Sequence, residues 1–207
     1  MSTTLHIQWT ITPRVPPQPW LNCSRCRGPR CFRDSGKIRF NANGRRIDAW
    51  LIYRCTVCDS TWNRPIVERR DLSTLDPQCL LSLQTNDPAL VRRLAFDGTA
   101  LRRWTGRVQE FDDVLVTRTV LSPSTRPLRL KIVCLVPEPI GLRLDRLLAG
   151  ELRLTRSGVR ALERSERLLV VPRGTGLRWP PRDGLQLVID TSAIPASSLL
   201  LATGGRG

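Results

Sequence analysis

The stretches Cys23-Ser24-Arg25-Cys26 and Cys55-Thr56-Val57-Cys58 each place two cysteines at the ends of a two-residue spacer. Such a spacer lets the backbone curl so that both sulfurs of a pair reach one metal ion. Zn²⁺ takes four thiolates in a tetrahedron, with Zn–S distances of about 2.3 Å. In a reducing compartment, paired cysteines are more often metal ligands than disulfides. The sequence therefore predicts one structural Zn²⁺, held by Cys23, Cys26, Cys55 and Cys58.

The residues between the two pairs predict a β-hairpin. Residues 37–42 and 45–54 flank Asn43-Gly44, the dipeptide that best tolerates the positive φ angles of a type I′ turn. A hairpin there returns the second pair beside the first, which is the arrangement of a zinc ribbon. Cys31 is a fifth candidate that could displace Cys26 or serve a redox role, but the paired spacing favours the other four.

The charge of the chain points to a polyanionic partner. The 207 residues carry a formal net charge of +15, and arginine supplies 31 of the 33 basic side chains. Residues 1–70 carry a net charge of +9, residues 71–127 carry none, and residues 128–207 carry +6. A codon bias explains the choice of arginine over lysine, but it does not explain why acidic residues fail to balance the two ends.

The hydrophobic pattern predicts an α+β fold with several parts. We expect a zinc-ribbon domain over residues 1–70, a helical middle segment and linker over residues 71–127, an α+β domain over residues 128–195 and a flexible tail over residues 196–207. The linker is clearest at residues 122–127, where Ser and Pro cluster.

The N-terminal residues predict a strand. Leu5, Ile7, Trp9 and Ile11 alternate with polar residues, and we expect this strand to join the zinc-ribbon sheet. The first residues lack a basic n-region and an apolar h-region, and no run approaches the roughly 20 apolar residues of a membrane helix. We therefore expect a cytoplasmic protein that has no contact with a membrane.

The first half resembles the bacterial family DUF1062, a domain of unknown function. The resemblance rests on the two cysteine pairs, on residues 40–44 (Phe-Asn-Ala-Asn-Gly), on residues 48–55 (Asp-Ala-Trp-Leu-Ile-Tyr-Arg-Cys) and on Trp62-Asn63. It implies no established activity.

The second half resembles the alpha-L (S-four-like) RNA-binding domain, which occurs in a small-subunit ribosomal protein, pseudouridine synthases and ribosome-rescue factors. Residues 143–148 match its first helix and residues 155–162 its second, whereas Glu166 stands where the family commonly has a turn glycine. The resemblance implies that basic residues on the two helices track RNA backbone. The matching positions are Arg143, Arg146, Arg156, Arg160 and Arg164.

The spacing within the second helix predicts a basic stripe. Arg156, Arg160, Arg164 and Arg167 recur at intervals that place them along one face of a helix. A solvated helix face, with Arg160 paired to Glu163, is the plainer interpretation of such a stripe. Its coincidence with the alpha-L pattern favours contact with structured RNA, such as ribosomal or transfer RNA.

Two other functions are weighed against RNA binding. A DNA-binding, transcription-associated regulator is the alternative, but no helix-turn-helix is apparent. An enzyme is not expected, because His6 is the only histidine, no phosphate-binding loop or nucleophile elbow appears, and a four-thiolate zinc has no open position for water. No small-molecule substrate is evident, and the oligomeric state is left open.

Overall fold

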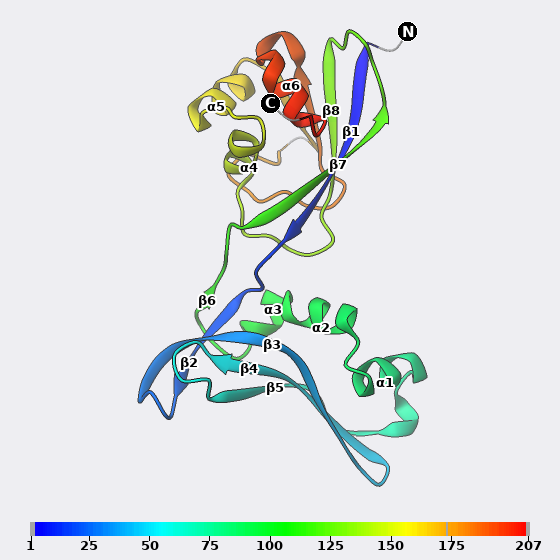
Figure 1. Cartoon of the computed structure of the whole chain (residues 1–207), viewed down its shortest axis with the longest axis vertical. Coiled ribbons are helices and arrows are strands. Elements are labelled where there is room, and N and C mark those ends of the chain that lie inside the picture. The colour runs from blue at the N-terminus through cyan, green and yellow to red at the C-terminus, as the bar shows by residue number, and fades with distance from the viewer. Residues whose placement is uncertain (1–2, 173, 206–207) are drawn as a thin grey trace. The chain divides into compact units, whose positions relative to one another are not determined.

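Strands from both ends of the sequence form one sheet, and the cysteine-rich region between them forms another. The computed structural model describes residues 3–172 and 174–205 (Figure 1). The chain divides into unit 1, which comprises Met1–Val15 and Phe111–Gly207, and unit 2, which is Pro16–Glu110. The α+β class expected from the sequence is confirmed.

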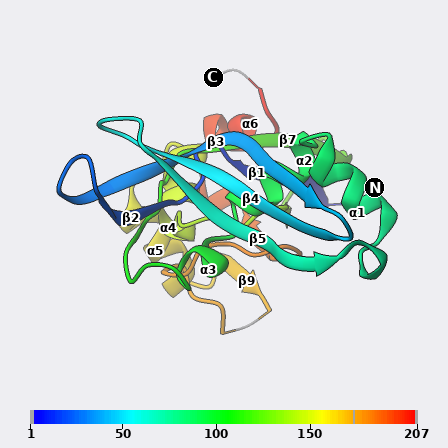
Figure 2. The ribbon, with the colours of Figure 1, turned by 90° about the horizontal axis from the view of Figure 1, so that it is seen from below.

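Unit 2 contains an antiparallel sheet with the strand order β5-β4-β3-β2-β6. Figure 2 shows its strands β2 to β5. Its strands are β2 (Gln18–Cys23), β3 (Gly28–Asn43), β4 (Arg46–Cys55), β5 (Thr61–Asp71) and β6 (Val108–Gln109). Between β5 and β6 lie the 3₁₀ helix η1 (Leu72–Thr74) and the helices α1 (Pro77–Gln84), α2 (Pro88–Ala95) and α3 (Gly98–Leu101).

The hairpin of β3 and β4 confirms the predicted strand pair, but its turn lies one residue later than expected. Asn43 pairs with Arg46, so Gly44 and Arg45 form the turn. Gly44 has a φ of 59°, the left-handed region that glycine adopts without steric cost. A single positive φ at Gly44 is therefore sufficient to close the hairpin.

One face of β4 carries the core of unit 2. Ile47, Ala49, Leu51 and Tyr53 are fully buried, whereas Trp50 and Ile52 on the opposite face are half-buried. The buried face packs against apolar residues of the helices, among them Val91, Ala95 and Leu101. The helix α2 begins at Pro88, because the Asp87 carboxylate accepts hydrogen bonds from the backbone N–H groups of Ala89 (2.7 Å) and Leu90 (3.1 Å).

Unit 1 contains a mixed sheet with the strand order β7-β1-β8-β10-β9, in which only β1 and β8 run parallel. Its strands are β1 (Thr4–Pro13), β7 (Val114–Ser122), β8 (Arg129–Leu135), β9 (Leu168–Val171) and β10 (Gln186–Asp190). Its helices are α4 (Leu144–Glu151), α5 (Arg156–Arg164), the 3₁₀ helix η2 (Thr191–Ala193) and α6 (Ala196–Ala202).

The N-terminal strand lies in a different sheet from the one expected. The alternation of Leu5, Ile7, Trp9 and Ile11 is confirmed, since all four are buried. The strand pairs with β7 and β8 of unit 1, however, so the expectation that it joins the cysteine-rich sheet is wrong. The alternation fixes which face is buried, but it carries no information about the partner strand.

The linker and the flexible tail expected from the sequence also differ from the structure. Residues 123–128 connect β7 to β8 within the sheet of unit 1, so the Ser- and Pro-rich segment does not separate two domains. Within the tail, residues 196–202 form α6, where Ser198 and Ala202 are buried. The Trp9 indole donates a hydrogen bond of 3.0 Å to the Ala202 carbonyl, and the Ser198 hydroxyl donates one of 2.6 Å to the Leu152 carbonyl. Residues 206–207 lie outside the described part of the chain.

Over residues 3–172 and 174–205, no helix has both the length and the apolar character needed to cross a membrane.

Candidate functional site

Two similar turns of unit 2 present the four cysteines of the predicted site. Cys23 ends β2 and Cys55 ends β4, and in each case the second cysteine of the pair lies in the turn that follows. The next residue has a positive φ in both turns, 51° at Arg27 and 57° at Asp59. The two cysteine pairs are therefore held by turns of the same local shape.

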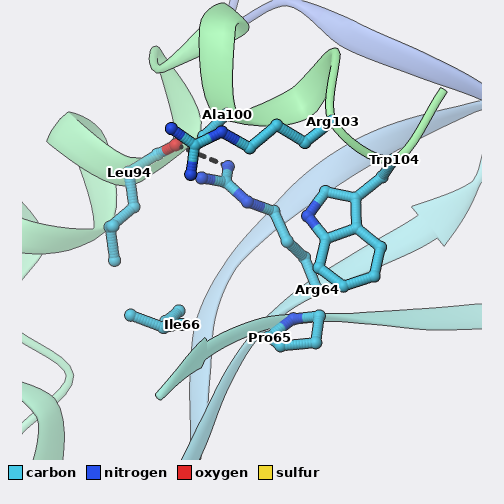
Figure 3. Close-up of a pocket in the computed structure, with 7 residues that line it drawn as sticks. All are labelled: Arg64, Pro65, Ile66, Leu94, Ala100, Arg103 and Trp104. Carbon is cyan, nitrogen blue, oxygen red and sulfur yellow. Dashed lines mark hydrogen bonds between the residues drawn. The ribbon is translucent and has the colours of Figure 1, made fainter. Parts of the chain in front are cut away.

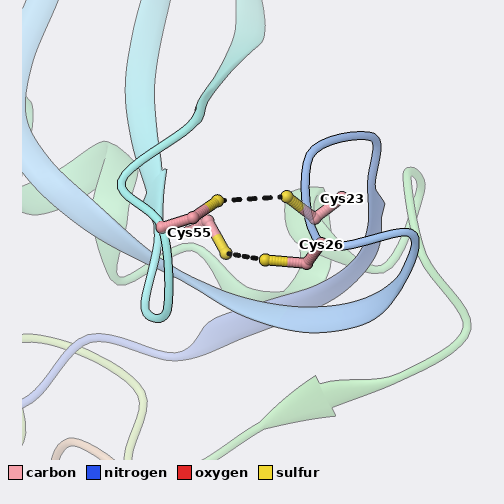
Figure 4. A group of neighbouring side chains, drawn as sticks. Cys23, Cys26 and Cys55 are labelled. Atoms are coloured by element: carbon pink, nitrogen blue, oxygen red, sulfur yellow. Dashed lines mark hydrogen bonds between the residues drawn. The ribbon is translucent and has the colours of Figure 1, made fainter.

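The four sulfurs converge on one point between the turns (Figure 4). All of them lie within 4.8 Å of one another, with 3.5 Å between the Sγ atoms of Cys23 and Cys58 and 3.9 Å between those of Cys26 and Cys55. A tetrahedral ion about 2.3 Å from each sulfur requires sulfur–sulfur separations of about 3.8 Å. The four cysteines are thus close enough to hold one metal ion, and their spacing is compatible with zinc.

The surroundings of the cluster favour thiolates at some of its positions. The Ser60 hydroxyl, 3.1 Å from the Cys58 sulfur, and the Ser60 backbone N–H lower the pKa of Cys58 to about 6. A hydrogen bond from the backbone of Cys26 lowers the pKa of Cys23. The pKa of Cys26 is raised to about 12, mainly by its interaction with the Cys58 sulfur and by desolvation. Four sulfurs this close do not all ionise without a cation, whereas a metal ion stabilises all four thiolates.

Cys31 stands apart from the cluster. Its sulfur lies 3.2 Å from the Gln18 side-chain oxygen, and burial raises its pKa. Arg25, which lies between Cys23 and Cys26 in the sequence, donates a hydrogen bond of 3.4 Å to the Cys58 carbonyl.

A second cluster lies on the two helices of unit 1, around Asp145. This carboxylate is fully buried and accepts hydrogen bonds from three guanidinium groups, those of Arg143 (3.0 Å and 3.2 Å), Arg156 (3.1 Å) and Arg160 (2.8 Å). Desolvation raises the pKa of Asp145, but the arginines outweigh it and lower that pKa to about 2. The side chains of the three arginines remain 36–49% exposed. One buried charge therefore holds three partly exposed cations in place.

The other predicted arginines have different surroundings. Arg146 forms an ion pair with Asp112. Arg164 is exposed in the last turn of α5, and no ion pair to it occurs among the described residues. Arg167 does not continue the helical stripe, because α5 ends at Arg164. It lines a hollow beside β9 and β10 with Glu166 and Asp190.

Sequence reasoning did not find Asp145. The available signal was an acidic residue in the first turn of a helix, two positions after one arginine, which is also a common arrangement on solvated helices. Contact with the arginines of α5 distinguishes the buried Asp145 from an acidic residue on a solvated helix. The spacing of residues within α4 does not reveal that contact.

Comparison with protein-family models gives a match to most of this region. The family model described as "Protein of unknown function (DUF1062)" matches residues 40–173, more than half of the chain. The chain belongs to the DUF1062 family. The match includes Cys55, Cys58 and the Asp145 cluster, whereas Cys23 and Cys26 precede it. Comparisons with curated proteins and with solved structures each found no match.

Proposed function

We propose that this DUF1062 protein is a zinc-binding, RNA-binding protein in which one structural Zn²⁺ stabilises the cysteine-rich sheet as a zinc ribbon. The arginine face of α4 and α5 contacts structured RNA such as ribosomal or transfer RNA. The observation that carries the proposal is the ring of Arg143, Arg156 and Arg160 around Asp145. Three arginines that share one carboxylate leave a local net charge of +2, and the carboxylate holds their guanidinium groups in place.

The geometry of the ring suits phosphate recognition. Each guanidinium has five N–H donors in a planar fork, and the contacts with Asp145 leave several of them available for a second oxyanion. A solvated stripe of independent arginines would lose side-chain entropy on binding a phosphate. The Asp145 carboxylate restrains three of these side chains in advance, so less entropy remains to be lost.

The order of elements adds support from the alpha-L resemblance. The structure has a helix at residues 144–151, a second at residues 156–164 and a strand at residues 168–171, where the resemblance expects them. Glu166, which replaces the common glycine, has a φ of 57°. The turn therefore keeps the left-handed conformation that a glycine would adopt easily.

The test is RNA binding by full-length protein, measured by fluorescence anisotropy with a structured RNA hairpin over a series of salt concentrations. Arg164→Ala removes an exposed cation that does not contact Asp145. We expect it to weaken RNA binding. The loss of one phosphate contact should reduce the magnitude of the slope of log K, the association constant, against log salt concentration by about 0.7–0.9.

The matched control is Arg126→Ala, which removes one exposed cation from the β7–β8 connection. It should leave affinity and slope nearly unchanged. Equal losses in the two variants would contradict a specific role of the helix face. Tighter binding to a DNA duplex than to the RNA hairpin at the same salt would favour the DNA-binding alternative.

A further inference from the structure

Arg64 of β5 is a buried cation in unit 2. Arg64 is only 4% exposed, and arginine side chains stay protonated in proteins. Within the described residues, no carboxylate lies within 4.0 Å of it. Desolvation raises the pKa of the nearby Asp34, and the field of Arg64 offsets a part of that rise. A buried charge without a counter-ion in direct contact is unusual, because desolvation costs several kcal/mol.

Two hydrogen bonds fix the position of Arg64, and both use Nη1. This nitrogen donates to the Leu94 carbonyl at 2.9 Å and to the Tyr53 hydroxyl at 3.4 Å. The Leu94 contact caps the C-terminal end of α2, so the arginine also stabilises the helix. The donors on Nε and Nη2 have no hydrogen-bond partner among the residues that the structure describes. They remain available to a ligand.

Arg64 lines a hollow of about 280 Å³ that also contains Arg103 and Trp104 (Figure 3). In this view the guanidinium groups of Arg64 and Arg103 both reach toward the Leu94 carbonyl, and the Trp104 indole stands beside the stem of Arg64. Trp104 is 47% exposed, and its ring packs edge-on against Trp62 at a centroid distance of 6.2 Å. Ile66 adds an apolar wall. The hollow therefore combines two cations with an aromatic surface.

Two other hollows in the described residues have acidic side chains in their lining. The one beside β9 and β10 contains Glu166 and Asp190 next to its arginines, and the one at the β3–β4 hairpin contains Asp48. The Arg64 hollow has two arginines and no acidic lining residue. The hairpin hollow has three arginines around Asp48 and so carries the same excess of positive charge. Of the three, only the Arg64 hollow joins its cations to an aromatic ring and has no carboxylate in its lining.

We propose that this hollow is a binding site for a small organic oxyanion, a phosphate or carboxylate carried on a flat ring. The oxyanion accepts hydrogen bonds from Arg64 and Arg103, and the ring lies against Trp104. The volume is close to the lower end of the range for small-molecule sites, about 300 Å³, which limits the occupant to about one ring and its charged group. The inference goes beyond RNA binding and does not depend on it.

The experiment is isothermal titration calorimetry of the zinc-loaded, full-length protein with phenyl phosphate and with benzoate. At least one of them should bind saturably at one site per chain, and the tighter of the two identifies phosphate or carboxylate as the preferred group. Inorganic phosphate and phenol, each lacking half of the ligand, should bind at least about tenfold more weakly. Absence of saturable binding by both oxyanions would overturn the proposal.

Three variants locate the binding. Arg103→Ala should weaken binding by about tenfold, and Trp104→Ala by at least about threefold, as expected for loss of a charge-assisted bond and of a ring contact. Arg102→Ala is the matched control, because Arg102 is also exposed but forms an ion pair with Glu110 and does not line the hollow. Identical affinities for Arg103→Ala and Arg102→Ala would show that the ligand binds elsewhere. Both positions are exposed, so these variants are expected to fold.

Discussion

Asp145 is the residue on which the arginine face of unit 1 depends. A carboxylate excluded from water is stable only when cations and hydrogen bonds replace its hydration, and Arg143, Arg156 and Arg160 supply both. The arginines are thus structural as well as available to a ligand. For this reason Arg156→Ala and Arg160→Ala are poor tests of RNA binding, whereas Arg164→Ala leaves the cluster intact.

Replacing Asp145 by asparagine should destabilise unit 1. The variant keeps the shape of the side chain but leaves three guanidinium groups around a neutral amide, at a cost of about 2 kcal/mol in the free energy of unfolding. Chemical denaturation at pH 7, followed by circular dichroism, measures this change. Asp183→Asn, at an exposed position, is the control and should have a smaller effect.

The same carboxylate predicts a pH dependence. The folded-state pKa of Asp145 is lowered to about 2 from an ordinary value of 3.8. Its contribution to stability is therefore fully present above about pH 4 and is lost as the pH falls toward about 2. The difference in unfolding free energy between the wild type and Asp145→Asn should shrink over this range. Loss of the proposed zinc in acid would affect both proteins alike, so it does not enter the difference. A constant difference from pH 6 to pH 2.5 would contradict the assignment.

The sequence predicts the positions of some site residues but not of others. The cysteine cluster follows from spacing alone, because two residues between thiols fix the local turn. Arg64 carries no such signal, since in a strand it is indistinguishable from the exposed arginines around it. Its burial depends on α2 and α3 covering the sheet, which is a tertiary property.

At the scale of elements, local sequence patterns predicted the strand β1 and the hairpin of β3 and β4, but they did not predict the sheet that β1 joins. The alternation in β1, the cap of α2 and the hairpin of β3 and β4 all follow from local rules. The pairing of β1 with β7 and β8 joins residues about 100 positions apart, and a strand pattern does not encode that choice. Helix α6 was missed for a related reason. It is short, and its order comes from docking rather than from intrinsic propensity.

Docking of α6 is testable by one pair of substitutions. Ala202 is fully buried and Leu200 on the same helix is 56% exposed. Ala202→Glu places a charge in the core of unit 1 and should lower the unfolding free energy by about 2–4 kcal/mol. Leu200→Glu adds the same charge at the surface and should change it by less than about 0.5 kcal/mol. Thermal and urea denaturation compare the two, and similar stabilities would mean that the helix is not docked in solution.

At the scale of the whole molecule, the positive charge is divided almost equally between the two units. Unit 2 has 17 basic and nine acidic residues, a net charge of +8, and unit 1 has 16 and nine, a net charge of +7. The neutral segment at residues 71–127 is divided between the two units. Charge along the sequence therefore did not reveal the boundaries, because unit 1 is assembled from two separate segments.

Metal removal should affect the two units differently. Cys55→Ser is expected to abolish zinc binding and to unfold unit 2, because the thiolate cluster joins β2 to β4, while Cys31→Ser retains one zinc per chain. Native mass spectrometry measures the zinc content, and amide NMR signals of β1 and β8 report on unit 1. Retention of one zinc per chain by both variants would refute the ligand assignment.

The place of β1 between β7 and β8 has a consequence for synthesis of the protein. When β1 leaves the ribosome, neither β7 nor β8 has been made, and residues 14–113 must be translated first. At about 5–20 residues per second, this strand waits about 5–20 s with Ile7, Trp9 and Ile11 uncovered. Unit 2 is complete before that wait ends, and β2 pairs with β6 where the chain enters and leaves it. With the proposed zinc site, a shortage of zinc would prolong the time in which a nascent chain carries both an open cysteine cluster and an unpaired apolar strand. Such chains are the ones that chaperones and proteases would meet.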